Sequence, residues 1–177
     1  MESEELKSVL IGGLEPVTVT VVDYDPSWPL RFEELQARVR AALGANAVIV
    51  EHIGSTAVPG LAAKPIIDIL IVVDDVNDEA GFVPPLQDAG FVLRVREPGH
   101  RMMRTPVKDV HLHLYDPHAG AIRDYLDFRD WLRTHPDDCD LYEAAKRQLA
   151  SQQWDDMNCY AEAKSDIITQ ILSRARG

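Results

Sequence analysis

One stretch decides the fold of this 177-residue chain, and it reads Glu51-His52-Ile53-Gly54-Ser55-Thr56-Ala57-Val58-Pro59-Gly60-Leu61-Ala62-Ala63-Lys64-Pro65-Ile66-Ile67-Asp68-Ile69-Leu70-Ile71-Val72-Val73. The stretch continues an apolar run from Ala47 to Ile53, which predicts a buried strand. After a turn of small residues, the β-branched run from Ile66 to Val73 predicts a second buried strand. That strand carries one acid, Asp68. An unpaired buried carboxylate is costly, so Asp68 needs a cation, a hydrogen-bond donor or a metal ion.

The turn between these strands has the chemistry of a phosphate site. Gly54 allows close approach of the backbone, and the Ser55 hydroxyl with nearby N–H groups can hold a phosphate. A nucleotidyltransferase uses such a turn to grip a triphosphate, and an acid on the next strand to hold the divalent ion. The alternative is a tight strand connection in which Asp68 pairs with Lys64 or with a histidine. Spacing alone leaves both interpretations open.

The composition argues against several classes of protein. The net charge of −11 argues against general nucleic-acid binding, which needs a basic surface. The sequence has no apolar run of the ~18 residues that span a membrane, and its acidic start is unlike a signal peptide. We therefore expect a cytoplasmic protein without a membrane partner. Cys139 and Cys159 fall in segments of helical pattern and are expected to be reduced structural thiols.

The pattern along the chain predicts a mixed α/β domain. Residues 1–16 read as a loosely ordered lead-in, and residues 17–175 as one domain with an α/β core at 17–118 and a helical part at 119–175. Within the core we expect strands at 17–22, 91–96, 100–105 and 110–116 and helices at 28–43 and 84–90. Trp28 is expected to anchor the first helix in the core. Further helices are expected at 119–133, from 136 or 137, and from Asp155 or Asn158 to Leu172.

Two sets of side chains in the core are candidates for ligand binding. Arg101 and Arg104, within a run of four arginines that starts at Arg94, suit phosphate oxygens, although pairing with surface carboxylates is equally compatible with the pattern. His111 and His113 alternate along one strand and therefore share a face, where they can bind a metal or orient a phosphate.

The helical part adds three cations. Lys146 and Lys164 each follow a tyrosine by one helical turn, Tyr142 and Tyr160, and each Tyr–Lys pair can grip a base and a phosphate. Exposed lysines paired with nearby acids are the equally supported alternative. Arg129 is expected to be such a paired surface cation.

Several of these segments resemble the GrpB (UPF0157) family. The segments are Tyr24-Asp25-Pro26 with Trp28-Pro29 and Phe32, the run Glu51 to Leu61, Lys64 to Ile69, the His111/His113 strand, and Phe128 to Pro136, Lys146 to Ala150 and Tyr160 with Lys164. The resemblance covers roughly residues 18–173. It implies a fold of the nucleotidyltransferase (polymerase-β-like) superfamily, an α/β core with a mixed sheet. The family is also found appended to some bacterial dephospho-CoA kinases.

The sequence departs from the wider superfamily at one position. Active members usually carry a second acid two residues after the first, and here Leu70 stands at that place. Two carboxylates bridging two Mg²⁺ ions are the usual route to nucleotidyl transfer. In the superfamily a later strand supplies a third carboxylate, and the resemblance places His111 or His113 there. One Asp with imidazoles is a softer site that can favour Mn²⁺ or Zn²⁺ over Mg²⁺.

The leading hypothesis is a metal-dependent nucleotidyltransferase that uses a nucleoside triphosphate and a small-molecule acceptor. Asp68, His111 and His113 would bind the ion, and Lys64 would neutralise the charge that develops on phosphate. The candidates for the phosphate side are Gly54, Ser55, Thr56, His52, Arg101, Arg104, Lys146 and Lys164. The alternatives are a non-catalytic module that binds a nucleotide or a CoA-like ligand, and an accessory interaction domain. The nucleotide, the acceptor, the metal and the oligomeric state stay open.

Overall fold

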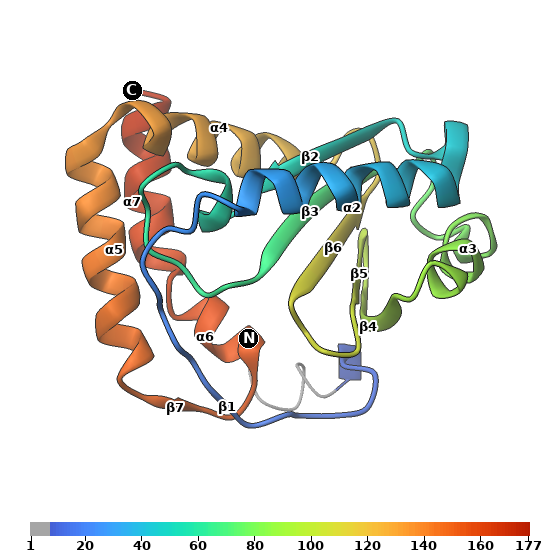
Figure 1. Ribbon diagram of the computed structural model, residues 1–177, viewed down its shortest axis with the longest axis horizontal. Coiled ribbons are helices and arrows are strands. Elements are labelled where there is room, and N and C mark those ends of the chain that lie inside the picture. The colour runs from blue at the N-terminus through green and yellow to red at the C-terminus, as the bar shows by residue number, and fades with distance from the viewer. Residues whose placement is uncertain (1–7) are drawn as a thin grey trace.

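A five-stranded mixed sheet forms the centre of the protein (Figure 1), and the computed structural model describes residues 8–177. The strands lie in the order β2-β3-β6-β5-β4, which are Ile49–Ile53, Ile67–Val72, Val110–Tyr115, His100–Arg104 and Val92–Glu97. Only the β3–β6 pair is parallel, and the other neighbours are antiparallel. The mixed sheet expected from the sequence is confirmed, with the first central strand starting at Ile49 rather than Ala47.

One face of this sheet is closed by helices α2 (Trp28–Leu43) and α3 (Val83–Asp88) (Figure 1). A proline in its first turn starts α2, and Gly44, with a φ of 55°, ends it, as the sequence pattern predicts. The apolar stripe of α2 packs on alternate residues of the central strands, including Ile69 and Leu112. Trp28 is 6% exposed and belongs to this core, which confirms its expected role as an anchor.

The opposite face of the sheet meets the C-terminal helices. These are α4 (Gly120–Thr134), α5 (Pro136–Ala150), α6 (Met157–Glu162) and α7 (Ser165–Ala175). Helix α4 packs over Leu70 and Tyr115 of the sheet, and α5 and α7 pack beside α4 in a second apolar cluster (Figure 1). Cys139 and Cys159 are free thiols here, as expected.

The last predicted helix is two helices in the structure. A turn at residues 163–164 separates α6 from α7, whereas the sequence pattern suggested one continuous element. Asp156 caps the start of α6 by accepting the backbone N–H of Asn158. The interruption lets α6 bury Tyr160 while the apolar stripe of α7, including Ile171, packs with Leu132 and Tyr142. The helical spacing of apolar residues continues across both helices, so it does not show that α6 and α7 pack on different parts of the protein.

The first predicted strand is shorter than expected and lies outside the main sheet. Only Val17–Thr18 (β1) is a strand, and it pairs with Gln153–Trp154 (β7) in a separate two-stranded sheet. Further on, Val22 makes an isolated bridge with Ala63. The stretch therefore pairs with two short partners and not with a strand of the main sheet.

Residues 8–16 differ from the expected loose lead-in. Leu10 is buried against Val95 and Met102, and the Ile11 amide donates to the Arg94 carbonyl at 2.8 Å. A bulge at Arg94 in β4 interrupts the expected alternation, so Arg94 and Val95 are both buried. The expectation for residues 1–7 lies outside the described residues. Within residues 8–177, no helix is long and apolar enough to cross a membrane.

Candidate functional site

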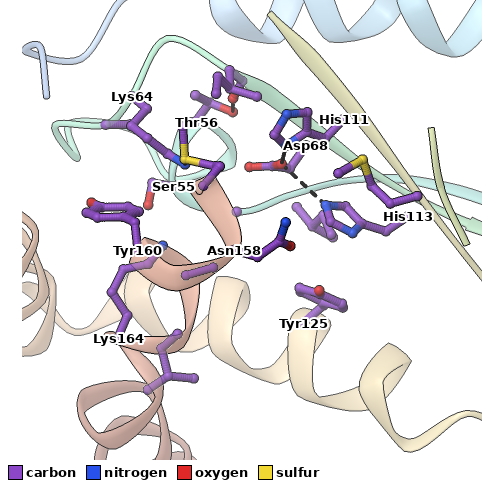
Figure 2. A pocket seen from close by; sticks show the side chains of 18 of the residues that line it. Ser55, Thr56, Lys64, Asp68, His111, His113, Tyr125, Asn158, Tyr160 and Lys164 are labelled. Atoms are coloured by element: carbon purple, nitrogen blue, oxygen red, sulfur yellow. Dashed lines mark hydrogen bonds and ion pairs between the residues drawn. The ribbon is translucent and has the colours of Figure 1, made fainter. Parts of the chain in front are cut away.

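Three predicted ligands converge on the sheet face beneath α4 and α6. In the parallel pairing of β3 and β6, Asp68 lies opposite His111, and Leu70 lies opposite His113. The Asp68 Oδ1 atom is 3.4 Å from His111 Nδ1 and 3.4 Å from His113 Nε2 (Figure 2). The alternative interpretation of Asp68, a carboxylate that pairs with histidines, is thus also present in this geometry.

The donor set fits a single divalent ion. The three ligand atoms all lie within 4.8 Å of one another. Two ligands about 2.1 Å from a tetrahedral ion lie roughly 3.4 Å apart, which matches both Asp68–His distances. Two imidazoles with one carboxylate favour Mn²⁺, Zn²⁺ or Fe²⁺ over Mg²⁺, which prefers oxygen ligands. The residues present can therefore hold an ion, and their chemistry favours a transition metal.

The protonation states suit metal binding. Burial works against ionisation of Asp68, but His111 and His113, whose ring nitrogens can donate to its carboxylate, outweigh it and hold the pKa of Asp68 well below its ordinary value. Burial lowers the pKa of His111, although the nearby Asp68 raises it. A carboxylate and a neutral imidazole are the forms that bind a metal.

The glycine turn lies directly against the acid. Gly54 has a φ of 71°, and a Cβ at this position would lie 2.7 Å from Asp68 Oδ2. Both the backbone conformation and the close approach therefore require glycine. The turn continues into the short helix η2 (Ser55–Ala57), which directs Ser55 and Thr56 to the same cavity as Asp68.

Three lysines from separate parts of the chain line the side of the cavity next to the glycine turn. Lys64 comes from the loop before β3, Lys146 from α5, and Lys164 from the turn between α6 and α7. The Lys146 Nζ donates to Ser55 Oγ at 3.0 Å and to the Ala62 carbonyl. The ammonium groups of Lys64 and Lys164 lie 4.8 Å and 4.6 Å from the Tyr160 ring centre (Figure 2). We call Lys64, Lys146 and Lys164 the lysine wall.

The lysine wall carries positive charge that is poorly compensated. Within residues 8–177, none of its ammonium groups has a carboxylate oxygen within 4.0 Å, the limit for a salt bridge. Burial, reinforced by repulsion from Lys164, lowers the pKa of both Lys64 and Lys146 to about 7. Burial lowers the pKa of Lys164 to about 8, although Asp68 raises it. An anion beside these groups would restore their charge.

Two tyrosines stand behind the lysine wall. Tyr142 lies one turn before Lys146, and its ring centre is 4.8 Å from the Lys146 ammonium. The Tyr142 hydroxyl hydrogen-bonds with Ser55, so α5 holds this serine with two groups. Tyr160 is fully buried, and its hydroxyl has no hydrogen-bond partner among the described residues. Both expected Tyr–Lys pairs are therefore formed, and one retains an unsatisfied polar group beside the cavity.

The ligand triad and the lysine wall line one cavity of about 410 Å³. Sequence reasoning missed several of its lining residues, namely Tyr125, Asp156, Met157 and Asn158, whereas Arg94 was already part of the predicted arginine run. Asn158 points into the space between the lysine wall and His113 (Figure 2), and its amide donates to Asp156 at 2.6 Å. Its only sequence signal was its place near a helix start, and that signal points to capping rather than to ligand binding.

Two of the candidate phosphate residues lie outside this cavity. The His52 Nε2 pairs with Thr56 Oγ1 at 2.9 Å, and the His52 ring stacks on Phe32. Burial lowers the pKa of His52 to about 4, so this neutral histidine positions Thr56 rather than binding an anion directly. Arg101 donates to Glu79 and to the Glu97 carbonyl, at 2.6 Å and 2.7 Å.

The other two arginines of interest are also paired. Arg104 lines the cavity, although one of its guanidinium nitrogens is 2.7 Å from Glu15 Oε1. Arg129 bonds to Glu51 at 2.8 Å and to Asp130 at 2.8 Å, so it is a paired cation as expected, but it is largely buried and tied to β2 rather than exposed on the surface. The basic character of the cavity therefore comes chiefly from the lysines.

Comparison with known proteins gives a consistent result. The model of the family described as GrpB protein matches residues 18–174. A UPF0157 protein of Streptomyces coelicolor is 52% identical over 94% of this chain and 89% of its own length. The crystal structure of the conserved protein GrpB from Enterococcus faecalis superposes with a TM-score of 0.77 at 34% identity, covering 88% of this chain and 96% of that one.

One longer relative contains a segment that is similar to this chain. A dephospho-CoA kinase of Mycolicibacterium paratuberculosis is 28% identical over 89% of this chain, but the match spans only 46% of that protein. The match to the family model covers most of this chain, and the family resemblance inferred from its motifs is confirmed. The chain therefore belongs to the GrpB family.

Proposed function

We propose that this protein binds a nucleoside triphosphate together with a divalent ion and transfers the nucleotidyl group to a small-molecule acceptor. The observation that carries the proposal is that Asp68, His111 and His113 line the same cavity as Lys64, Lys146 and Lys164. A metal site and an uncompensated cationic wall in one cavity suit a polyphosphate. The cytoplasmic location expected from the sequence would supply such a substrate.

The metal-binding residues, the η2 turn and the lysine wall each have a distinct role in this proposal. Asp68, His111 and His113 would hold the ion, whose positive charge would neutralise part of the charge of the phosphates. Ser55, held by Lys146 and Tyr142, would bind a phosphate oxygen through the η2 turn. Lys64 and Lys164 would bind the outer phosphates and stabilise the charge that develops on departing pyrophosphate.

The proposed step is an in-line substitution at the α-phosphorus. A bond forms between the acceptor oxygen and the α-phosphorus, and the bond from that phosphorus to the α–β bridging oxygen breaks. Pyrophosphate leaves with the electron pair, and the proton of the acceptor hydroxyl goes to water. Binding of both reactants in this cavity would replace a bimolecular encounter by a local one.

A second candidate function rests on Leu70. This side chain is fully buried and packs beneath α4, so the site has one metal-binding carboxylate where ordinary transferases have two. A module that binds a nucleotide or a CoA-like ligand without turnover would need only the turn, the ion and the lysines. The relative that is a dephospho-CoA kinase keeps the accessory-domain alternative in view.

The test is calorimetric titration with ATP, GTP, CTP, UTP and CoA, each with Mg²⁺ or Mn²⁺. The proteins are the wild type, Asp68→Asn and the control Asp74→Asn, which changes an exposed acid just after the same strand. We expect triphosphate binding that requires the ion, that is weaker by 100-fold or more in Asp68→Asn, and that is unchanged in Asp74→Asn.

The outcome decides between the candidates. Pyrophosphate release with a panel of small acceptors would support transfer over simple binding. Binding that requires neither the ion nor Asp68 would favour the ligand-binding module. If no nucleotide and no CoA binds, both the transferase and the ligand-binding module are excluded. Thermal unfolding of Asp68→Asn in the absence of metal checks that the variant is folded.

A further inference from the structure

A chain of polar groups lies behind His113, outside the set of residues that the proposed function uses. The His113 Nδ1 atom is 3.3 Å from His100 Nε2, and His100 Nδ1 is 2.5 Å from Glu97 Oε1. Glu97 ends β4 and His100 begins β5, so the two residues face each other across the turn of this hairpin. The chain therefore runs from Glu97 through His100 and His113 to Asp68.

The rings are placed for hydrogen bonding along this chain. The planes of His100 and His113 differ by only 8°, and the two rings meet through their nitrogens. These features describe an in-plane hydrogen bond rather than a stack. The ring of Tyr115 stacks on His100 with centres 4.5 Å apart, which fixes the plane of His100.

The direction of each hydrogen bond follows from the carboxylate at the end. The Glu97 carboxylate only accepts, so His100 Nδ1 carries a hydrogen and donates to it. A neutral His100 that donates from Nδ1 has its lone pair on Nε2, and this atom lies 3.3 Å from His113 Nδ1. His113 must then donate from Nδ1, which leaves a lone pair on His113 Nε2.

This arrangement has a consequence at the other end of the chain. In this tautomer a lone pair of His113 Nε2 faces the Asp68 Oδ1 atom at 3.4 Å, in place of the hydrogen that the other tautomer would donate to it. Two acceptors facing each other at this distance repel unless a cation lies between them. Metal-binding histidines commonly have their other ring nitrogen held by a hydrogen bond of this kind.

We infer that Glu97 and His100 are positioning residues that fix His113 as the Nδ1–H tautomer and so present its Nε2 to a divalent ion at Asp68. The inference rests on the metal site of the proposed function, but not on the nucleotide or on transfer. The alternative role for the pair is only to stabilise the β4–β5 hairpin. That role predicts a change in folding stability without a selective change in metal affinity.

The experiment measures the affinity of the protein for Zn²⁺ and Mn²⁺ alone. His100→Phe keeps a ring to stack on Tyr115 but removes the acceptor nitrogen, and we expect metal affinity to fall about 10-fold to 100-fold. His100→Gln places an amide oxygen near the lost nitrogen, and its affinity should return to within about threefold of the wild type. Glu97→Ala should lie between these two variants.

The control is Glu79→Gln, which removes another carboxylate, one that pairs with Arg96 and Arg101 of the β4–β5 hairpin but does not contact the triad. It should leave metal affinity unchanged. In a His113→Ala background, His100→Phe should cause no further loss of affinity. Long-range proton–nitrogen NMR on the Zn²⁺-loaded wild type should show His100 as the Nδ1–H tautomer.

Three results would overturn the inference. They are a His100→Phe variant with wild-type metal affinity, an equal loss in the His113→Ala background, and an Nε2–H tautomer of His100. Absence of metal binding by the wild type would overturn both this inference and the metal role in the proposed function. Metal binding without nucleotide binding would overturn the proposed function while leaving the positioning role intact.

Discussion

The two faces of strands β3 and β6 differ although their residues alternate along the same chain. On the α2 face, Ile69 and Leu112 are fully buried in a continuous apolar core. On the α4 face, Leu70 is equally buried, but Asp68 and His113 are only partly covered and line a cavity. Helices α2 and α3 close the first face, whereas α4 covers only part of the second (Figure 1).

The difference shows how the sheet combines stability with a site. The α2 face supplies a dry core that fixes the register of β3 and β6, and that register sets Asp68 opposite His111. The α4 face places uncompensated charges beside the resulting cavity, at a cost in stability that a bound anion would offset. The α2 face therefore positions the groups that the α4 face uses.

The largest expected effect comes from adding an acid to the closed part of the α4 face. Leu70→Asp would restore the second acid of the wider superfamily, but this position is fully buried among apolar residues of α4. We expect a loss of about 4 kcal/mol in the free energy of unfolding, because the new carboxylate lacks a partner. Urea denaturation with and without Mn²⁺ measures this change.

Leu70→Met is the matched control and should cost less than about 1.5 kcal/mol. If Mn²⁺ restored the stability of Leu70→Asp and raised pyrophosphate release, the new acid would have reached the ion. That outcome would contradict the closed packing of α4 over this position.

The fold was predictable because its patterns are local. Alternation placed His111 and His113 on one face, and the β-branched run around Asp68 identified a buried strand that carries one acid. The helix from Trp28 was bounded by a proline and a glycine, whose backbone limits act at single positions. The bulge at Arg94 and the division between α6 and α7 depend on residues distant in sequence, so no local pattern predicts them.

The site was predictable only in part, for a similar reason. The triad lies on two neighbouring strands, so alternation and one parallel pairing suffice to assemble it. Lys64, Lys146 and Lys164 share no element, and only tertiary packing makes them one wall. Arg101 and Arg104 lie in the same predicted strand and could not be told apart from the sequence. In the structure, Arg101 pairs with Glu79 and lies outside the cavity. His100 carries no local signal of its role, because that role depends on the contact of its ring with His113.

A smaller and opposite effect is expected when the α4 face is made more apolar. Lys64→Met should raise the free energy of unfolding by about 1 kcal/mol at pH 7, since solvent relaxation reduces the cost of the buried charge but does not remove it. The lysine pKa is about 7 in the folded protein and about 10.4 when unfolded. The unfolded chain therefore binds more protons between these values, and wild-type stability should rise with pH across this window.

Denaturation curves at pH 7, 8 and 9 test this prediction, and Lys64→Met should show a weaker rise than the wild type. The same variant should bind triphosphate at least 10-fold more weakly, because it removes a charge from the cavity. Lys108→Met is the control, since Lys108 is exposed and pairs with Glu15. A Lys64→Met variant that is less stable than the wild type at pH 7 would show that the charge is not a cost.

The smallest expected effect defines the boundary of the site. Arg104→Gln removes a cation that lines the cavity, but Glu15 already neutralises much of its charge. We expect about a threefold loss in triphosphate affinity, equivalent to about 0.7 kcal/mol. Arg101→Gln changes a guanidinium that faces Glu79 outside the cavity, so it should leave this affinity unchanged. Parallel calorimetric titrations compare the two variants with the wild type. A larger loss in Arg101→Gln than in Arg104→Gln would place the phosphates on the far side of β5, and the assignment of the lysine wall to them would then be wrong.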